Sequence, residues 1–239
     1  MSVTTSDAPH PNLRSFLFLA FSGMFFGIFL SLHIIGTSVA AFGELAFNQG
    51  LELLRKVYQH PAFEVCLAAS FVLHMIAGSI LHWRRDKFGF APSPPAQWYV
   101  RLQRLSGSVI GFIILLHVSG TRLPVLLGKH RPEDFAHLHV LFRTAPVFVF
   151  AYCGIYAGCA IVHLLLGIPQ VFERVRALPS GSYHKIASHW LFWFLVVATT
   201  SSVFAGMYAL YDLTPANKAD LEYWTPIVQA NVPAMLRST

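Results

Sequence analysis

The sequence predicts an all-α integral membrane protein, a single transmembrane domain of five helices over residues 1–239. Two observations predict it. Only 12% of the residues are charged, against about 25% in a typical soluble domain. Charged side chains are also almost absent from five long apolar runs, each long enough to cross a hydrocarbon core of about 30 Å at 1.5 Å per residue. This composition excludes a soluble enzyme, a nucleic-acid module and a disulfide scaffold.

Turn residues and charges separate the runs. The first run is too long for a cleaved signal peptide and follows a segment without a basic n-region, so we expect a retained helix. Residues 43–60 are amphipathic and are expected along the membrane interface. Residues 212–239 form a polar C-terminal tail with three prolines, expected at the surface. The five expected helices cover residues 13–42, 62–83, 102–127, 144–168 and 186–211.

The charge distribution does not decide the orientation. With the N-terminus inside, nine Lys and Arg residues flank the inner ends of the helices and eight flank the outer ends. The dense basic cluster at 84–104 favours an inner N-terminus. The net charge of +6 is therefore interpreted as helix-end charge at lipid headgroups or partner subunits, with no nucleic-acid binding implied.

Histidine is the second unusual feature, with twelve residues against eleven acidic ones. His33, His74, His117 and His163 lie well inside the first four expected helices, one in each. A polar side chain at that depth is costly and usually functional, although a single buried histidine is more often structural. Neutral imidazole is a common axial ligand of haem iron, and two imidazoles fill both axial positions. Four histidines on successive helices therefore indicate the ligands of two b-type haems.

Depth along each helix indicates how these histidines pair. The first and third helices run in one direction and the second and fourth in the other. Counting 1.5 Å per residue places His33 and His117 toward the outer side, and His74 and His163 toward the inner side. His82, eight residues after His74, stays open as the alternative inner ligand, although an interfacial histidine is its simpler interpretation.

Glycines accompany the histidines. Gly78 and Gly167 each follow a histidine by four residues and so share its helix face, which leaves space for a flat macrocycle. Pairs of glycines also precede His33 and His117 in the same helices. Close packing between helices through small residues is the alternative explanation of this spacing.

Four segments carry a resemblance to a known family. The most specific is Arg101–Leu123 (RLQRLSGSVIGFIILLHVSGTRL), and the others are GIFLSLH at 27–33, HMIAG at 74–78 and HLLLGI at 163–168. In these segments the chain resembles the five-helix, single-chain dihaem cytochrome b subunit of succinate:quinone oxidoreductases and fumarate reductases. The resemblance covers the first four helices. It implies that His33 and His117 ligate the distal haem, and that His74 and His163, rather than His82, ligate the proximal haem.

The family implies the rest of the expected function. The chain would be a membrane anchor in the inner membrane of a prokaryote, with its N-terminus in the cytoplasm and its C-terminus outside. A flavoprotein with FAD and a subunit with iron–sulfur clusters would dock on the cytoplasmic face and hold the succinate or fumarate site. Electrons would pass through the two b haems to a quinone, either menaquinone or ubiquinone. The direction of the reaction and the oligomeric state of the complex stay open.

Three charged residues join the expected site. Arg104, in the Gln-Arg-x-x-Gly element, is expected at the proximal haem propionates, and Arg122 at a distal propionate. Glu64 is the one carboxylate within an expected span, and we expect it to exchange protons with the quinone. Its alternative role is a helix N-terminal charge. Some dihaem fumarate reductases have a glutamate two residues before the fourth ligand, where this chain has Ile161, so we expect no compensating proton route.

Other interpretations remain. The chain resembles less well the cytochrome b of a membrane hydrogenase or formate dehydrogenase, which the Gln-Arg-x-x-Gly element does not fit. A transporter with proton-carrying histidines and no haem is an alternative from another class. His137 and His139 have the spacing of a metal pair, but without further donors we expect surface histidines there.

Overall fold

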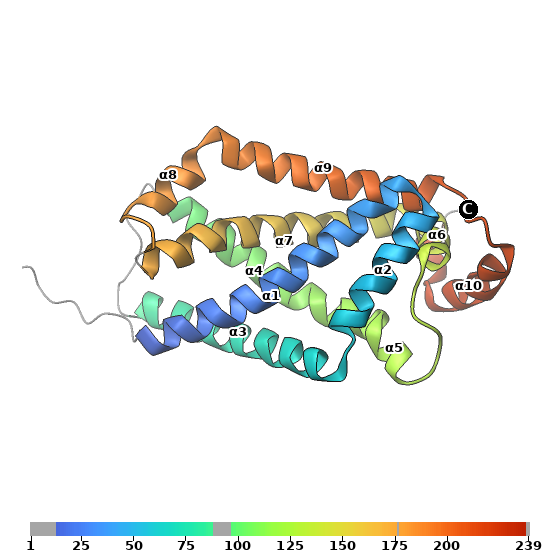
Figure 1. The fold of residues 1–239 in the computed structure, drawn as a ribbon, viewed down its shortest axis with the longest axis horizontal. Helices are drawn as coiled ribbons and strands as arrows, with labels where there is room; N and C mark the ends of the chain where they lie inside the picture. The colour runs from blue at the N-terminus through green and yellow to red at the C-terminus, as the bar shows by residue number, and fades with distance from the viewer. Residues whose placement is uncertain (1–12, 88–96, 176, 238–239) are drawn as a thin grey trace, which may run out of the picture.

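A computed structural model describes residues 13–87, 97–175 and 177–237, and within these ranges the chain is helical and contains no strand (Figure 1). In chain order the elements are α1 (Leu13–Val39), the 3-10 helix η1 (Ala40–Phe42), α2 (Glu44–Tyr58), α3 (Pro61–Lys87), α4 (Gln97–Gly120), α5 (Arg122–Leu126), α6 (Phe135–Thr144), α7 (Pro146–Arg174), α8 (Ser182–Ser188), α9 (Trp190–Asp212), α10 (Lys218–Asn231) and the 3-10 helix η3 (Ala234–Leu236).

Five segments of the described chain are long and apolar enough to cross a membrane, which confirms the predicted all-α, multi-pass architecture. They belong to α1, α3, α4 with α5, α7 and α9. Their large apolar side chains are widely exposed on the outside of the bundle, as expected where the solvent is lipid. The segments are Phe18–Phe42, Pro61–Ile80, Trp98–Leu126, Pro146–Glu173 and Trp190–Asp212.

The spans pack as two pairs, which are joined through α9 and through a smaller direct contact of α1 with α7. α1 packs along α3, α4 packs along α7, and α9 contacts both α1 and α7. α9 approaches α1 so closely that a Cβ at Gly206 would collide with the Thr37 carbonyl. Figure 1 shows the five long helices side by side, with α8 at one end of the bundle and α2, α5, α6 and α10 gathered at the other. The histidines of the expected site lie between these ends.

Two of the predicted helices are interrupted in the structure. The third ends at Gly120 and resumes as the short α5, because Pro124 has no N–H to donate to the Gly120 carbonyl. The fifth was expected from Ile186, but α9 begins at Trp190, where the His189 ring accepts a hydrogen bond from the Leu191 N–H at 3.2 Å. Residues 182–188 form the separate α8.

The chain outside the spans is also helical. Residues 44–58 form the amphipathic α2, which packs beside α1. The expected polar tail contains α10, which begins at the Asn217 N-cap and packs against α6. Trp224 and Val228 are buried in that contact, at 0% and 3% exposure. Leu221, Ile227 and Val232 add partly buried apolar contacts, so one apolar face of a polar helix holds the tail against α6.

Candidate functional site

The four intramembrane histidines meet in two pairs across the bundle. The ring centroids of His33 on α1 and His117 on α4 are 5.9 Å apart. Those of His74 on α3 and His163 on α7 are 6.1 Å apart. The structure thus brings together the partners that depth along the helices indicated. Two imidazoles that bind one metal ion from opposite sides, with metal–nitrogen bonds of about 2.0 Å, have ring centroids roughly 6 Å apart.

Hydrogen bonds fix the tautomer of one pair. His74 Nδ1 lies 3.2 Å from the Leu19 carbonyl oxygen, and His163 Nδ1 lies 2.8 Å from the Gln103 carbonyl oxygen. A carbonyl only accepts, so each Nδ1 carries the proton and donates it. The lone pair therefore stays on Nε2, the arrangement that metal-ligating histidines commonly have.

Glycines on neighbouring helices make room for the same two rings. A Cβ at Gly23 on α1 would lie 2.7 Å from His74 Cε1, and a Cβ at Gly107 on α4 would lie 2.7 Å from His163 Cε1. Both separations are too short for any side chain. Each ring thus lies directly against a glycine, one turn beyond the carbonyl that its Nδ1 contacts.

This arrangement occurs twice with the same spacing. α1 has the Leu19 carbonyl, Gly23 and then His33, and α4 has the Gln103 carbonyl, Gly107 and then His117. In both helices the histidine follows the glycine by ten residues (33 − 23 and 117 − 107). Ten residues of helix span about 15 Å, so the His33–His117 pair lies that far along the bundle from the His74–His163 pair.

Aromatic rings surround the pair at the α2 and α5 end. Phe29 stacks on His33, with ring centroids 5.7 Å apart, and Tyr156 lies 5.3 Å from His117. The Phe29 ring in turn meets Tyr58 of α2 edge-on at 5.4 Å. The rings of Phe29, Tyr58 and Tyr156 thus form aromatic surroundings for the pair, and an imidazole in its neutral form can act as a ligand.

Gly78 and Gly167 have more open surroundings than Gly23 and Gly107. The nearest atoms to a Cβ at these positions would be Leu19 Cδ1 at 3.8 Å and Gln103 Nε2 at 3.4 Å, which are ordinary van der Waals separations. The prediction that these two glycines leave space for a macrocycle stays a prediction.

Glu64 and Arg122 form an ion pair, with Arg122 Nε 2.6 Å from Glu64 Oε1. Glu64 precedes His74 by ten residues on α3, which runs opposite to α1, so it lies at the level of the His33–His117 pair. Both side chains are about one-quarter exposed, which leaves the pair accessible from outside the bundle. Arg104 lies half-buried near the start of α4, three residues before Gly107.

The remaining candidate histidines lie elsewhere. The side chain of His82 is outside the described part of the structure. His137 packs on Trp224, with centroids 4.4 Å apart, and His139 Nδ1 lies 3.0 Å from the Leu210 carbonyl oxygen. Among the described residues, no three or more His, Cys, Asp or Glu side chains gather as a metal cluster.

The residues of the two pairs fit b-type haem. The donors are two pairs of imidazoles with ring centroids about 6 Å apart, and in one pair each Nδ1 contacts a carbonyl oxygen. Comparison of the chain with models of protein families, with curated proteins and with solved structures found no match. The chemistry of the site therefore carries the functional argument.

Proposed function

We propose that the chain is the membrane-anchor cytochrome b subunit of a succinate dehydrogenase or fumarate reductase complex. The observation that supports this most is the close approach of two imidazoles at each of two levels of the bundle, with ring centroids 5.9 and 6.1 Å apart. When bound, a haem with both axial positions filled carries single electrons between an iron–sulfur partner and membrane quinone. The chain itself would contribute to a succinate:quinone oxidoreductase of the respiratory chain and tricarboxylic acid cycle without holding the succinate or fumarate site.

In this proposal the residues have separate tasks. His33 and His117 hold the distal haem, and His74 and His163 hold the proximal haem. The carbonyls of Leu19 and Gln103 orient the proximal rings by accepting the Nδ1 protons. The α8 end of the bundle faces the cytoplasm and receives the iron–sulfur and flavoprotein subunits. Arg104 supplies positive charge for the proximal propionates.

Glu64 is the proposed group for proton exchange with quinone. It lies at the level of the distal pair and is partly exposed, so it is open to solvent and to a ligand in the membrane. Its ion pair places it beside the Arg122 guanidinium, for which a quinone or propionate would compete. We expect Glu64→Gln to lower quinone turnover of the assembled complex at unchanged haem content, and Glu52→Gln, which removes an exposed carboxylate of α2, to leave turnover unchanged.

Haem spectroscopy tests the proposal. A purified preparation should show b-type absorption bands on reduction, with two haems per chain by extraction. A transporter whose histidines carry protons would show neither, and a chain without haem would refute the proposal.

The matched pair His74→Ala and His82→Ala tests the assignment of ligands. His74→Ala removes one side of the proximal pair, so we expect the loss of one haem of the two. His82→Ala should keep both. Retention of both haems in His74→Ala with loss in His82→Ala would transfer the ligand role to His82.

A further inference from the structure

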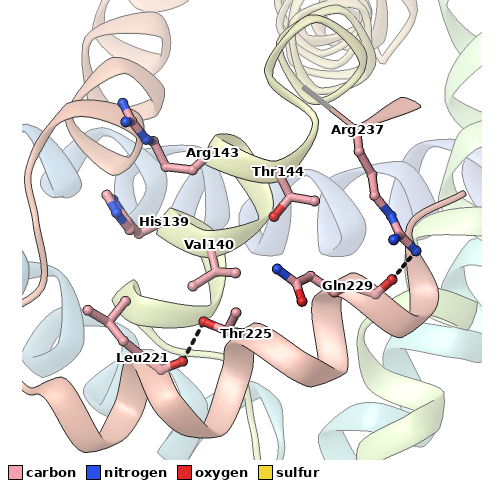
Figure 2. Close-up of a pocket in the computed structure, with 8 residues that line it drawn as sticks. All are labelled: His139, Val140, Arg143, Thr144, Leu221, Thr225, Gln229 and Arg237. Carbon is pink, nitrogen blue, oxygen red and sulfur yellow. Dashed lines mark hydrogen bonds between the residues drawn. The ribbon is translucent and has the colours of Figure 1, made fainter. Parts of the chain in front are cut away.

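A polar cavity lies between α6 and α10, at the end of the bundle opposite α8 (Figure 2). Its volume is about 580 Å³, within the range of roughly 300–1,000 Å³ that is typical of small-molecule sites. It is lined by His139, Val140, Arg143, Thr144, Leu221, Thr225, Gln229 and Arg237.

The lining is cationic. It includes two arginines, and none of the described lining residues is acidic. Figure 2 shows Arg143 and Arg237 on opposite sides of the cavity, with the Thr144 hydroxyl and the Gln229 amide between them. The Arg143 guanidinium points away from Gln229 and Arg237, so the Arg237 guanidinium and the Gln229 amide are the donors that can meet one anion with several acceptor oxygens.

Some of the donors already have partners within the chain. Arg237 Nε donates to the Val232 carbonyl at 3.0 Å, and Arg237 Nη2 donates to the Gln229 carbonyl. Arg143 lies over the Tyr211 ring, 4.8 Å from its centroid. A guanidinium has five N–H donors and cannot lose its proton, so each arginine keeps its full charge at the cavity. These contacts hold the two charges in place.

The cavity also lies at a defined membrane level. Thr144 precedes the Pro146–Glu173 span by two residues, and Tyr211 is the penultimate residue of the Trp190–Asp212 span. One span therefore begins and the other ends near the cavity, so we expect the cavity at the depth of the lipid phosphates. Tyrosine and arginine are typical of this interfacial layer.

We propose that the cavity between α6 and α10 binds the phosphate group of an anionic phospholipid from the adjacent leaflet. The phosphate lies beside Arg237, and the Gln229 amide donates to it, while Arg143 adds positive charge on the opposite side of the cavity. The acyl chains lie along the exposed apolar surface of the bundle. A lipid held in this way links α10 to the membrane, and the site is independent of the histidine pairs.

The test uses the full chain purified in neutral detergent. It is titrated with short-chain phosphatidylglycerol, with the matching phosphatidylcholine and with inorganic phosphate, and bound ligand is counted by native mass spectrometry. Arg237→Gln removes one charge, and Gln229→Glu places a carboxylate in the cavity at nearly constant shape. Lys218→Gln is the matched control, because it removes a charge from an exposed position of α10 outside the cavity.

We expect one phosphatidylglycerol to bind in preference to phosphatidylcholine. Arg237→Gln and Gln229→Glu should each weaken it about tenfold, the loss expected for one charge-assisted hydrogen bond, while Lys218→Gln leaves it unchanged. Melting curves of the variants show whether α10 remains folded. Equal binding of the two lipids, an equal loss in Lys218→Gln, or inorganic phosphate binding as tightly as the lipid would each overturn the lipid assignment.

Discussion

At the scale of single residues, two glycines decide where the proximal rings can lie. Gly23 and Gly107 leave no space for a methyl group beside His74 and His163. A side chain there would push the ring away from its carbonyl partner, either Leu19 or Gln103. A metal ligand must hold its position to within about 0.5 Å, so we expect a small displacement of the ring to be enough to lose the bound group.

Gly107→Ala tests this, on the basis of the proposed haem site. We expect the variant to contain one haem in place of two, because the added Cβ would lie 2.7 Å from His163 Cε1. Gly158→Ala on α7 is the matched control, since no atom of the described chain lies within 4 Å of a Cβ there. Haem extraction and reduced spectra of both variants measure the difference. Two haems in Gly107→Ala would show that His163 can move without loss.

The histidine pairs could be predicted from the sequence, but their supporting contacts could not. Pairing by depth needs only the rise per residue and the alternation of helix direction. The acceptors of the Nδ1 protons are backbone carbonyls, which every residue has, so Leu19 and Gln103 give no signal of their own. The repeated spacing of ten residues from Gly23 to His33 and from Gly107 to His117 was a usable signal. The contact of Glu64 with Arg122 joins residues 58 positions apart, which no local pattern predicts.

At the scale of elements, α10 shows what composition leaves out. Its sequence is polar, with Pro226 inside it, and predicts a tail at the surface without indicating its structure. The segment lies at one end of the bundle as a helix that packs on α6 through Trp224 and Val228, beside Ala136 and Val140. The spans, in contrast, were predicted well, because twenty apolar residues have few alternatives to a helix in lipid. Two helix ends differ from the predicted ones because a single residue determines each of them: Pro124 interrupts the third span, and His189 caps the start of α9.

The docking of α10 should depend on pH through His137, which packs on Trp224. Burial, with a smaller contribution from His130 and Arg55, lowers the pKa of His137 to about 4. When α10 opens, the ring reaches water and its pKa returns toward 6.5, so the open state binds more protons between these values. Docking is therefore strongest above pH 6.5 and weakens as the pH falls toward 4, by up to about 3 kcal/mol.

Hydrogen exchange of the α10 amides measures this dependence. After correction for the intrinsic effect of pH, protection should decrease from pH 6.5 to pH 4 in the natural chain. His137→Phe keeps a ring against Trp224 but cannot take up a proton, so its protection should change little over the same range. His130→Phe is the companion variant, since it leaves His137 in place and should retain the decrease. Equal profiles for the natural chain and His137→Phe would exclude His137 as the cause.

At the scale of the whole molecule, the two ends of the bundle differ in what covers them. α2, α5, α6 and α10 gather at one end, where α10 packs on α6, whereas α8 lies at the other end (Figure 1). In the described part of the chain, α8 is the one helix outside the spans at its end, and we expect a large partner subunit to dock there. The count of nine Lys and Arg residues on one side of the helices against eight on the other could not distinguish the two ends, because it ignores where the residues lie. The proposed orientation therefore places α8 in the cytoplasm and α10 outside.

Single cysteines at the two ends test this orientation. In a chain with Cys66, Cys153 and Cys159 replaced by Ala, Ser180→Cys lies in the exposed link before α8, and Lys218→Cys lies at the exposed start of α10. A membrane-impermeant maleimide added outside an intact inner membrane should label Lys218→Cys only, and lysis should expose Ser180→Cys. The reverse pattern would place α10 in the cytoplasm, which would bring the partner subunits to the covered end and exclude the proposed docking face. Because both positions are exposed, a difference in labelling reports the side of the membrane and not burial.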